Sequence, residues 1–366
     1  MPILSKIVVS DFRNIELQEL EFSPNVNCIS GGNGEGKTNL LDAIWHLSMT
    51  KSAFGASDRS DCRYGTSRYA ISGTYTMPGG TVSRFSIRAG DEAKKIRRDD
   101  KPYTRVSDHI GTLPIVMVSP ADISMVSESG EERRKFVNSV LSQMDREYLS
   151  AVQQYTRLLL QRNKLLKAGM TDEDLLSTYD ARLGALASPI FEKRREFVRE
   201  LTPVVQRFYA GISGGREQVG IDYRSDLQKG PLEQTLKARR ERDAILKFTT
   251  AGVQRDDFVF TMNGHPIRQC GSQGQQKSFL VALKFAQYEI MKNAYGYPPT
   301  LLLDDLFDKL DMERVSNLLQ MVAGSDFGQI FLTDSNKVRI SAIVDSLTAD
   351  RAYFEAEGGV FTRRDG

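Results

Sequence analysis

The chain has 366 residues, with 49 Lys and Arg against 47 Asp and Glu and a net charge of +2. Its 40% hydrophobic and 26% charged content is typical of a folded globular protein and excludes a disordered chain. No apolar run approaches the roughly eighteen residues of a membrane span, which excludes an integral membrane protein. Charges interrupt the amino-terminal segment before a signal peptide can form. The three cysteines and three histidines are scattered, so we expect a cytoplasmic protein without disulfides or a histidine metal cluster.

The first part of the chain is rich in segments that alternate apolar and polar residues, a pattern typical of strands. The predicted strands cover residues 3–12, 17–22, 25–30, 69–77 and 81–89, with a further hairpin over 94–106. Between them, apolar residues on one face predict a helix from about Lys37 to Met49.

A helical region follows the apolar strand LPIVMVS. Few glycines occur from about Glu131 to Ile212, and aromatic and apolar residues recur there at helical spacing from Tyr148 onwards. The break KAGMTDED predicts an antiparallel helical pair or a small bundle, whose aromatic stripe is better explained as core packing than as a nucleotide platform.

Beyond Gly214, strands and helices alternate again to the end of the chain. We therefore predict an α/β head with a mixed sheet, divided in sequence by a helical insert. The predicted parts are residues 1–120 for the first half of the head, 121–213 for the insert and 214–366 for the second half.

Basic residues gather in three stretches despite the balanced total charge. Residues 94–105 hold six basic and two acidic residues, while 145–167 and 237–247 each hold five basic and two acidic residues. Such clusters can bind phosphate backbones. Ordinary solvated surface explains each of them about equally well, so both interpretations stay open.

The strongest motif follows the third predicted strand and opens the first predicted helix. It fits G-x-x-x-x-G-K-[ST] and consists of Gly31, Gly32, Asn33, Gly34, Glu35, Gly36, Lys37 and Thr38. Glycines let backbone amides surround phosphate oxygens at a helix amino terminus. In such a loop the lysine reaches the β and γ phosphates and the hydroxyl binds Mg²⁺. The loop predicts a nucleotide-binding site.

Two carboxylates end a short apolar strand near the carboxyl end of the chain. Asp304 and Asp305 follow TLLL. We predict that Asp304 holds the metal, directly or through water, together with Thr38. Asp305 is then placed to orient or deprotonate the attacking water. The weaker alternative is a core strand that runs into an acidic turn.

A second helix start is suited to bind an anion. Ser272, Gln273, Gly274 and Gln275 precede a long helix, and offer a hydroxyl and accessible backbone amides. A simple helix cap is the alternative explanation. Two anion-binding helix starts in one chain favour a dimer in which each serves a different nucleotide.

Together these motifs resemble the ABC-type ATPases of the SMC-like group, and more narrowly the RecF family of bacterial DNA replication and repair proteins. The similar segments follow one order along nearly the whole chain. They include FRNIELQELEFSPNVNCISGGNGEGKTNLLDAI, ERRKFVNSVLSQ, YTRLLLQRNKLLK, GVQRDDF and SQGQQKSFLVALKFAQYE.

The resemblance implies roles for particular residues. Ser272, Gly274 and Gln275 would contact the nucleotide held by the other protomer, and Asp311 would lie in the D-loop. Arg13 and Asn14 would lie near the bound nucleotide. Thr333 and Asp334 end the strand that often precedes a switch histidine, which this chain lacks.

The resemblance also implies a function. Such proteins dimerise on DNA with ATP at single-strand gaps, and assist RecO and RecR in loading the RecA recombinase. Single-stranded and duplex DNA are thus the implied partners, and a weak, DNA-stimulated ATPase activity is the implied chemistry.

Other P-loop proteins fit less well. A transporter ATPase would keep a switch histidine and lack the helical insert, and a P-loop kinase would not need SQGQQ. A GTPase needs N-K-x-D, whereas residues Asn336 to Arg339 end without an acid. The alternative from another class is a structural clamp that closes on DNA with ATP and hardly turns it over.

Overall fold

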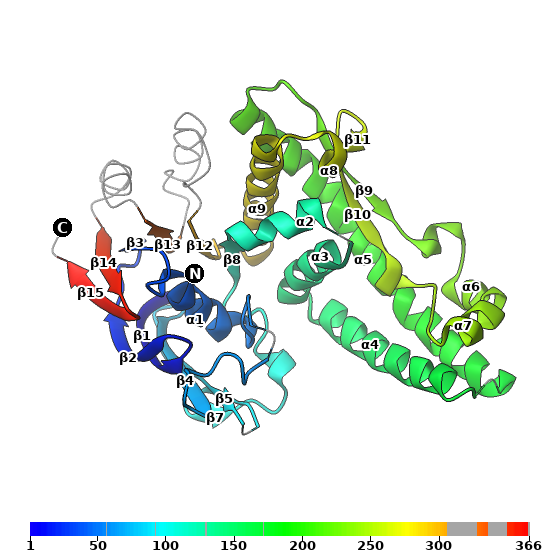
Figure 1. Ribbon diagram of the computed structural model, residues 1–366, viewed down its shortest axis with the longest axis horizontal. Helices are drawn as coiled ribbons and strands as arrows, with labels where there is room; N and C mark the ends of the chain where they lie inside the picture. The colour runs from blue at the N-terminus through cyan, green and yellow to red at the C-terminus, as the bar shows by residue number, and fades with distance from the viewer. Residues whose placement is uncertain are drawn as a thin grey trace. The chain divides into compact units, whose positions relative to one another are not determined.

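The chain forms two compact units in the computed structural model (Figure 1). The residues described are 1–55, 57–91, 93–128, 130–170, 172–305, 328–335 and 350–364. The first unit comprises Met1–Asp122 and Gln287–Gly366, and the second comprises Ile123–Ala286. The predicted divisions were at 120/121 and 213/214. Beyond the second of these, β9 (Val219–Arg224) and β10 (Asp257–Met262) pack against helices of the insert.

The first unit contains an antiparallel sheet built entirely from the amino-terminal part of the chain. Its strand order is β2-β1-β4-β5-β6-β7. The strands are β1 (Ile3–Phe12), β2 (Ile15–Glu21), β4 (Arg68–Thr76), β5 (Val82–Gly90), β6 (Lys95–Arg98) and β7 (Lys101–Pro102). Buried and more accessible residues alternate along β4 and β5, so one face packs on the core while the other meets solvent.

The second sheet of this unit is mixed, as predicted. Its order is β15-β14-β3-β13-β12-β8, and β14 with β15 is its antiparallel pair. The strands are β3 (Val26–Ser30), β8 (Ile115–Val118), β12 (Thr300–Leu303), β13 (Ile330–Asp334), β14 (Arg351–Glu357) and β15 (Val360–Arg364). Every residue of β8, β12 and β13 is buried, which explains their continuous apolar runs.

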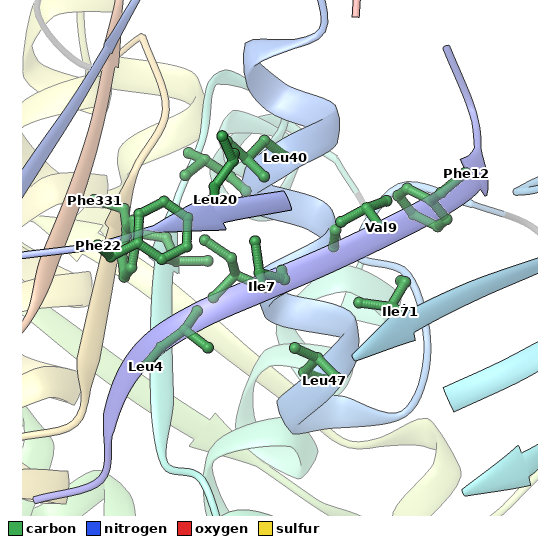
Figure 2. Packing of buried hydrophobic residues seen from close by; sticks show 14 of the residues in the cluster. Leu4, Ile7, Val9, Phe12, Leu20, Phe22, Leu40, Leu47, Ile71 and Phe331 are labelled. Carbon is green, nitrogen blue, oxygen red and sulfur yellow. The ribbon is translucent and has the colours of Figure 1, made fainter. Parts of the chain in front are cut away.

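One hydrophobic core joins the two sheets to helix α1 (Lys37–Met49). Figure 2 shows Ile7 and Val9 of β1 with Leu40 and Leu47 of α1 in this cluster. Phe22 meets Phe331 of β13 edge to face, with ring centroids 4.9 Å apart. Each such side chain contributes about 1.5–3 kcal/mol when fully buried. This core fixes the end of β3 relative to α1, which is where the phosphate loop lies.

The second unit combines the insert helices with a small antiparallel sheet of order β11-β10-β9. Its other elements are α2 (Ser124–Ser127), α3 (Gly130–Met144), α4 (Arg146–Lys167), α5 (Glu173–Ser213), α6 (Leu232–Ala238), α7 (Arg240–Leu246), β11 (His265–Pro266) and α8 (Ile267–Cys270). Helix α9 (Gln273–Tyr295) begins here and continues past Ala286. The predicted helical pair is confirmed as α4 and α5, which pack together. Tyr148 and Tyr155 are buried, so the aromatic stripe is core packing.

Two consecutive carboxylates fasten β10 to the insert helices. The Arg194 and Tyr223 side chains both donate to Asp256 Oδ2, at 2.5 and 2.6 Å. Arg133 donates to both oxygens of Asp257, at 2.8 and 3.1 Å. Burial raises the pKa of Asp256, and the Arg194 guanidinium opposes that shift. The GVQRDDF segment therefore has a structural role within this unit.

The basic stretch 145–167 is not a continuous charged surface. Arg162 has no exposed side-chain area and donates to Asp180 at 2.9 Å and to Asp243 at 2.8 Å. Assigning Arg162 to a phosphate-binding surface is therefore wrong, because its charge is neutralised inside the second unit.

No helix among the described residues is long and apolar enough to cross a membrane. Parts of the alternating region predicted beyond Gly214 fall outside the described residues, and so do Asp311 and Asn336 to Arg339.

Candidate nucleotide site

The phosphate loop lies between β3 and α1, as the motif predicts. Gly36 has a φ of 102°, and a Cβ there would lie 2.7 Å from Asn14 Nδ2. A Cβ on Gly31 would lie 2.4 Å from the carbonyl oxygen of Ala356 in β14. Both positions therefore require glycine, one for its backbone conformation and both for the close approach of neighbouring segments. The result is a tight loop directly before α1.

Lys37 is buried, and its ammonium group turns back into this loop. Nζ donates to the carbonyl oxygens of Gly31 and Gly32, both at 2.9 Å. An ammonium group has three donors and swings on a flexible stem. The ammonium group therefore lies within the loop, where phosphate oxygens can replace the two carbonyl oxygens as its acceptors.

Thr38 joins the loop to the acidic strand. Its hydroxyl lies 3.0 and 2.9 Å from the two carboxylate oxygens of Asp304, to which it donates. Burial raises the pKa of Asp304, whereas hydrogen bonds from Thr333 and Thr38 oppose the shift. The described residues contain no group of three or more His, Cys, Asp or Glu side chains suited to a metal. One hydroxyl and one carboxylate fit Mg²⁺ that keeps phosphate and water as its other ligands.

Thr333 is the residue that sequence reasoning missed. It is the second-last residue of β13 and lies next to Asp304, since Leu303 of β12 pairs with Leu332 of β13. Its hydroxyl donates to Asp304 Oδ1 at 2.7 Å and accepts from the Asp305 backbone amide at 3.0 Å. The available signal was a hydroxyl at the carboxyl end of a neighbouring parallel strand, a position that depends on strand order.

Asp305 follows β12 in a left-handed conformation with a φ of 41°. This conformation is uncommon outside glycine, although Asp and Asn adopt it more readily than other residues. The bend at Asp305 ends the strand beside Asp304. It brings both predicted acids to the edge of the sheet where the phosphate loop begins.

Asn14 lies against the loop, whereas the Arg13 side chain is engaged elsewhere. Asn39 donates to Asn14 Oδ1 at 2.7 Å. Arg13 Nη2 pairs with Asp42 at 2.8 Å and with Asp61 at 3.2 Å. Burial raises the pKa of Asp61 to about 6, although the Arg13 guanidinium acts to lower it. Arg13 thus anchors the turn that presents Asn14 to Gly36.

The second predicted anion-binding helix start, Ser272 to Gln275, lies in the second unit at the beginning of α9. Gln275 N–H donates to the Ser272 hydroxyl at 3.3 Å, and Gln275 Oε1 accepts from Ser272 N–H at 2.8 Å. This reciprocal pair is a capping box, so the simple-cap explanation holds for the free chain. The capping hydroxyl acts as acceptor, which leaves its hydrogen able to reach an oxygen outside. Gln273 is exposed and Gly274 is half-buried at this helix start.

The basic hairpin of the first unit splits its charges between two faces. Lys94 pairs with Asp58 at 2.5 Å, and the Arg98 guanidinium lies 5.4 Å from the Phe85 ring centroid on the packed side. Arg68, Arg88, Lys95 and Arg97 instead line a hollow of about 340 Å³ with Ser10 and Asp11. The stretch 94–105 is therefore not one surface, because alternate residues of β6 point to opposite faces.

Comparison with known proteins shows the family to which the chain belongs. The family described as the RecF/RecN/SMC N terminal domain matches residues 3–349. DNA replication and repair protein RecF of Bacteroides fragilis is 40% identical over 99% of both chains. The protein of the same name from Bacteroides thetaiotaomicron is 41% identical over 98% of both. The chain belongs to the RecF family of DNA replication and repair proteins.

Solved structures of RecF have the same fold. One described as the recombination mediator protein RecF-ATPrS in the RecFOR pathway has a TM-score of 0.88 and 28% identity, covering 100% of this chain and 98% of that one. A RecF-ATP structure of the same pathway has a TM-score of 0.88 and 27% identity, with 99% of each chain covered. An Smc head domain from Pyrococcus furiosus covers 100% of this chain and 96% of its own at 14% identity and a TM-score of 0.59, a likeness of fold alone. The resemblance to RecF and the ABC-type head are both confirmed.

Proposed function

We propose that this RecF-family chain binds ATP with Mg²⁺ in the phosphate loop and uses it to dimerise on DNA during replication and repair. The observation that carries the proposal is the contact of Thr38 with Asp304. It joins the glycine loop to the acidic strand across 266 positions of sequence. Neither an ordinary glycine turn nor an ordinary acidic turn accounts for that pairing.

Each residue of the site has a distinct proposed task. Loop amides from Gly32 to Gly36 hold the phosphate oxygens, and Lys37 exchanges its loop carbonyls for the β and γ phosphates. Thr38 and Asp304 hold Mg²⁺, which when bound neutralises phosphate charge. Asp305 positions the attacking water and accepts its proton. We expect slow, DNA-stimulated hydrolysis from this arrangement.

The ATP-dependent unit in this proposal is a homodimer. Ser272, Gln273, Gly274 and Gln275 of one chain complete the nucleotide site of the other, with Ser272 donating its free hydrogen to a phosphate oxygen. ATP then favours the dimer by mass action, because only the dimer makes both sets of contacts. RecO and RecR are the proposed partners at single-strand gaps, in keeping with the pathway named for the solved RecF structures.

DNA phosphates are proposed to contact the solvent face of the antiparallel sheet. Arg68, Arg88 and Lys95 are exposed there and Arg97 is half-buried. Several such contacts bind DNA without reading its sequence, and each neutralised phosphate steepens the salt dependence by about 0.9 in log–log slope for duplex DNA.

The test of the ATP site compares Lys37→Met with Lys51→Met, which removes an exposed lysine just beyond α1. We expect Lys37→Met to abolish ATP-driven dimerisation in light scattering and ATP-dependent binding to gapped DNA, while Lys51→Met behaves as wild type. Hydrolysis by Lys37→Met at the wild-type rate would contradict the proposal.

A non-turnover clamp differs from an ATPase cycle at Asp305. Asp305→Asn keeps the metal ligand Asp304 and removes the proposed base. If hydrolysis is required, this variant binds gapped DNA with ATP but no longer releases it. Unchanged release, measured by competition with unlabelled DNA, would favour the clamp.

A further inference from the structure

The second unit contains a basic hollow that the nucleotide site does not explain. It lies among the end of β9, the following 3-10 turn (Asp226–Lys229) and α7, and it has a volume of about 540 Å³. Five cationic side chains line it, together with a single carboxylate, that of Asp226. The cations are Arg224, Lys229, Arg239, Arg242 and Arg255.

Most of this positive charge is not neutralised. Arg239 pairs with Asp226 at 3.0 Å and donates to the Thr250 carbonyl at 2.9 Å, which fixes its guanidinium in the wall. Lys229, Arg242 and Arg255 are exposed and form no side-chain hydrogen bond or ion pair within the part of the chain described here. The hollow thus presents one fixed guanidinium and three cationic side chains, unpaired among the described residues, to anionic oxygens.

Large apolar side chains border the same hollow. Leu246 is 43% exposed and Phe248 is 39% exposed, and both line it. The adjacent Ile245 is 79% exposed. Lys247 lies between Leu246 and Phe248 and caps the carboxyl end of α7. Its backbone is left-handed, with a φ of 60°, a conformation that is unfavourable for residues other than glycine. Exposed apolar side chains grouped beside charged ones are typical of protein-binding surfaces.

A buried polar network holds this corner rigid. Asp243 accepts from the amide and the hydroxyl of Thr250, at 2.9 and 2.7 Å. Arg162 donates to Asp243 and to the Thr249 hydroxyl, both at 2.8 Å. The residues directly after Phe248, Thr249 and Thr250, are therefore held by buried side chains. A binding surface on a rigid support loses little entropy when a ligand docks.

From these features we propose that the hollow is a docking site for an acidic peptide segment of a partner protein, with one Leu- or Phe-like side chain as its anchor. Carboxylates match the guanidinium forks of Arg242 and Arg255. The anchor packs on Leu246 and Phe248. A DNA backbone would satisfy the cations but leave these apolar side chains in water, so the border favours a peptide.

The test uses the full-length protein and fluorescein-labelled nine-residue peptides. One set combines Asp and Glu with a single central Leu or Phe, a second replaces the anchor by Ser, and a third replaces the acids by Lys. In fluorescence anisotropy the first set should bind, and each replacement should weaken binding about tenfold or more.

Variants locate the binding. Arg242→Glu and Phe248→Ser should each lower the affinity of the best peptide about tenfold or more. Arg157→Glu makes the same charge change on an exposed residue of α4 outside the hollow and serves as the matched control. Arg242 forms no ion pair or side-chain hydrogen bond among the described residues, so its substitution leaves the fold intact.

Three results would overturn the proposal. These are no binding by any peptide of the first set below 1 mM (about −4 kcal/mol), equal weakening by Arg157→Glu and Arg242→Glu, and indifference to the central Leu or Phe. A 20-base-pair duplex (about two helical turns) that displaces the peptide, and loses affinity through Arg242→Glu, would instead assign the hollow to nucleic acid.

Discussion

Replacing Thr333 by Val tests how the acidic strand is held at the nucleotide site. Valine keeps the shape of threonine but removes the hydroxyl that donates to Asp304 and accepts from the Asp305 amide. A hydrogen bond to a charged group contributes about 1.5–3 kcal/mol, and a buried amide left without a partner costs about 1–3 kcal/mol. Since the two terms overlap, we expect a loss of about 2–4 kcal/mol in the free energy of unfolding.

The nucleotide site should respond as well. The Thr333 hydroxyl lowers the pKa of Asp304, so its removal raises that pKa and favours the protonated acid. Protonated Asp304 binds Mg²⁺ poorly. The Mg²⁺-dependent part of ATP affinity should therefore fall, and the pH at which it is half-maximal should move upward.

The chain's single tryptophan makes the assay specific. Trp45 lies in α1 of the first unit, so its fluorescence during urea unfolding follows that unit. ATP titrations with and without Mg²⁺ measure the second effect, and Thr333→Ser, which restores a hydroxyl, is the control. Wild-type stability and Mg²⁺ dependence in Thr333→Val would refute the role given to Thr333.

Three further predictions concern the nucleotide site shared between two chains, the pH dependence of stability, and the stability of the second unit. Ser272→Arg and Lys37→Met should each be inactive alone but regain hydrolysis when mixed; no recovery argues against a shared site. Because the fold raises the pKa of Asp61 to about 6, protonation of Asp61 stabilises the folded state. This contribution to the free energy of unfolding is fully present below about pH 4 and falls as the pH rises toward 6, by at most about 1.4 kcal/mol per pH unit. Asp61→Asn should flatten that decline in urea titrations, and an unchanged slope counts against it. Arg194→Met leaves Asp256 buried without its cation and should destabilise the second unit by about 3–5 kcal/mol, measured by hydrogen exchange along α5; unchanged exchange would contradict it.

The glycine loop between β3 and α1 was predictable because its sequence signal is local. The glycines, Lys37 and Thr38 are consecutive, and the loop needs them in that order whatever the surrounding fold. The break between α4, which ends at Lys167, and α5, which begins at Glu173, was also predictable. The segment KAGMTDED interrupts the helical pattern and contains the capping residue Asp172.

Residues that act through long-range pairing were not predictable in the same way. Thr333 matters because β13 lies beside β12, and no local pattern specifies which strands become neighbours. Arg162 was counted with the basic surface stretch because its partners, Asp180 and Asp243, are distant in sequence. The division of the hairpin cations between Lys95 and Arg98 depended on a register that the sequence stretch 94–105 left open.

The order of strands in the mixed sheet has a consequence for how the protein is made. The antiparallel sheet is complete once residue 102 has been synthesised. In contrast, β3 and β8 must wait for partners that begin at Thr300, because β3 pairs with β13 and β14, and β8 with β12. A nascent chain therefore carries two apolar strands with open edges through most of translation, a state prone to aggregation. Asp304 and the β14 backbone beside Gly31 are likewise synthesised long after the phosphate loop, so the loop meets these neighbours only late in translation.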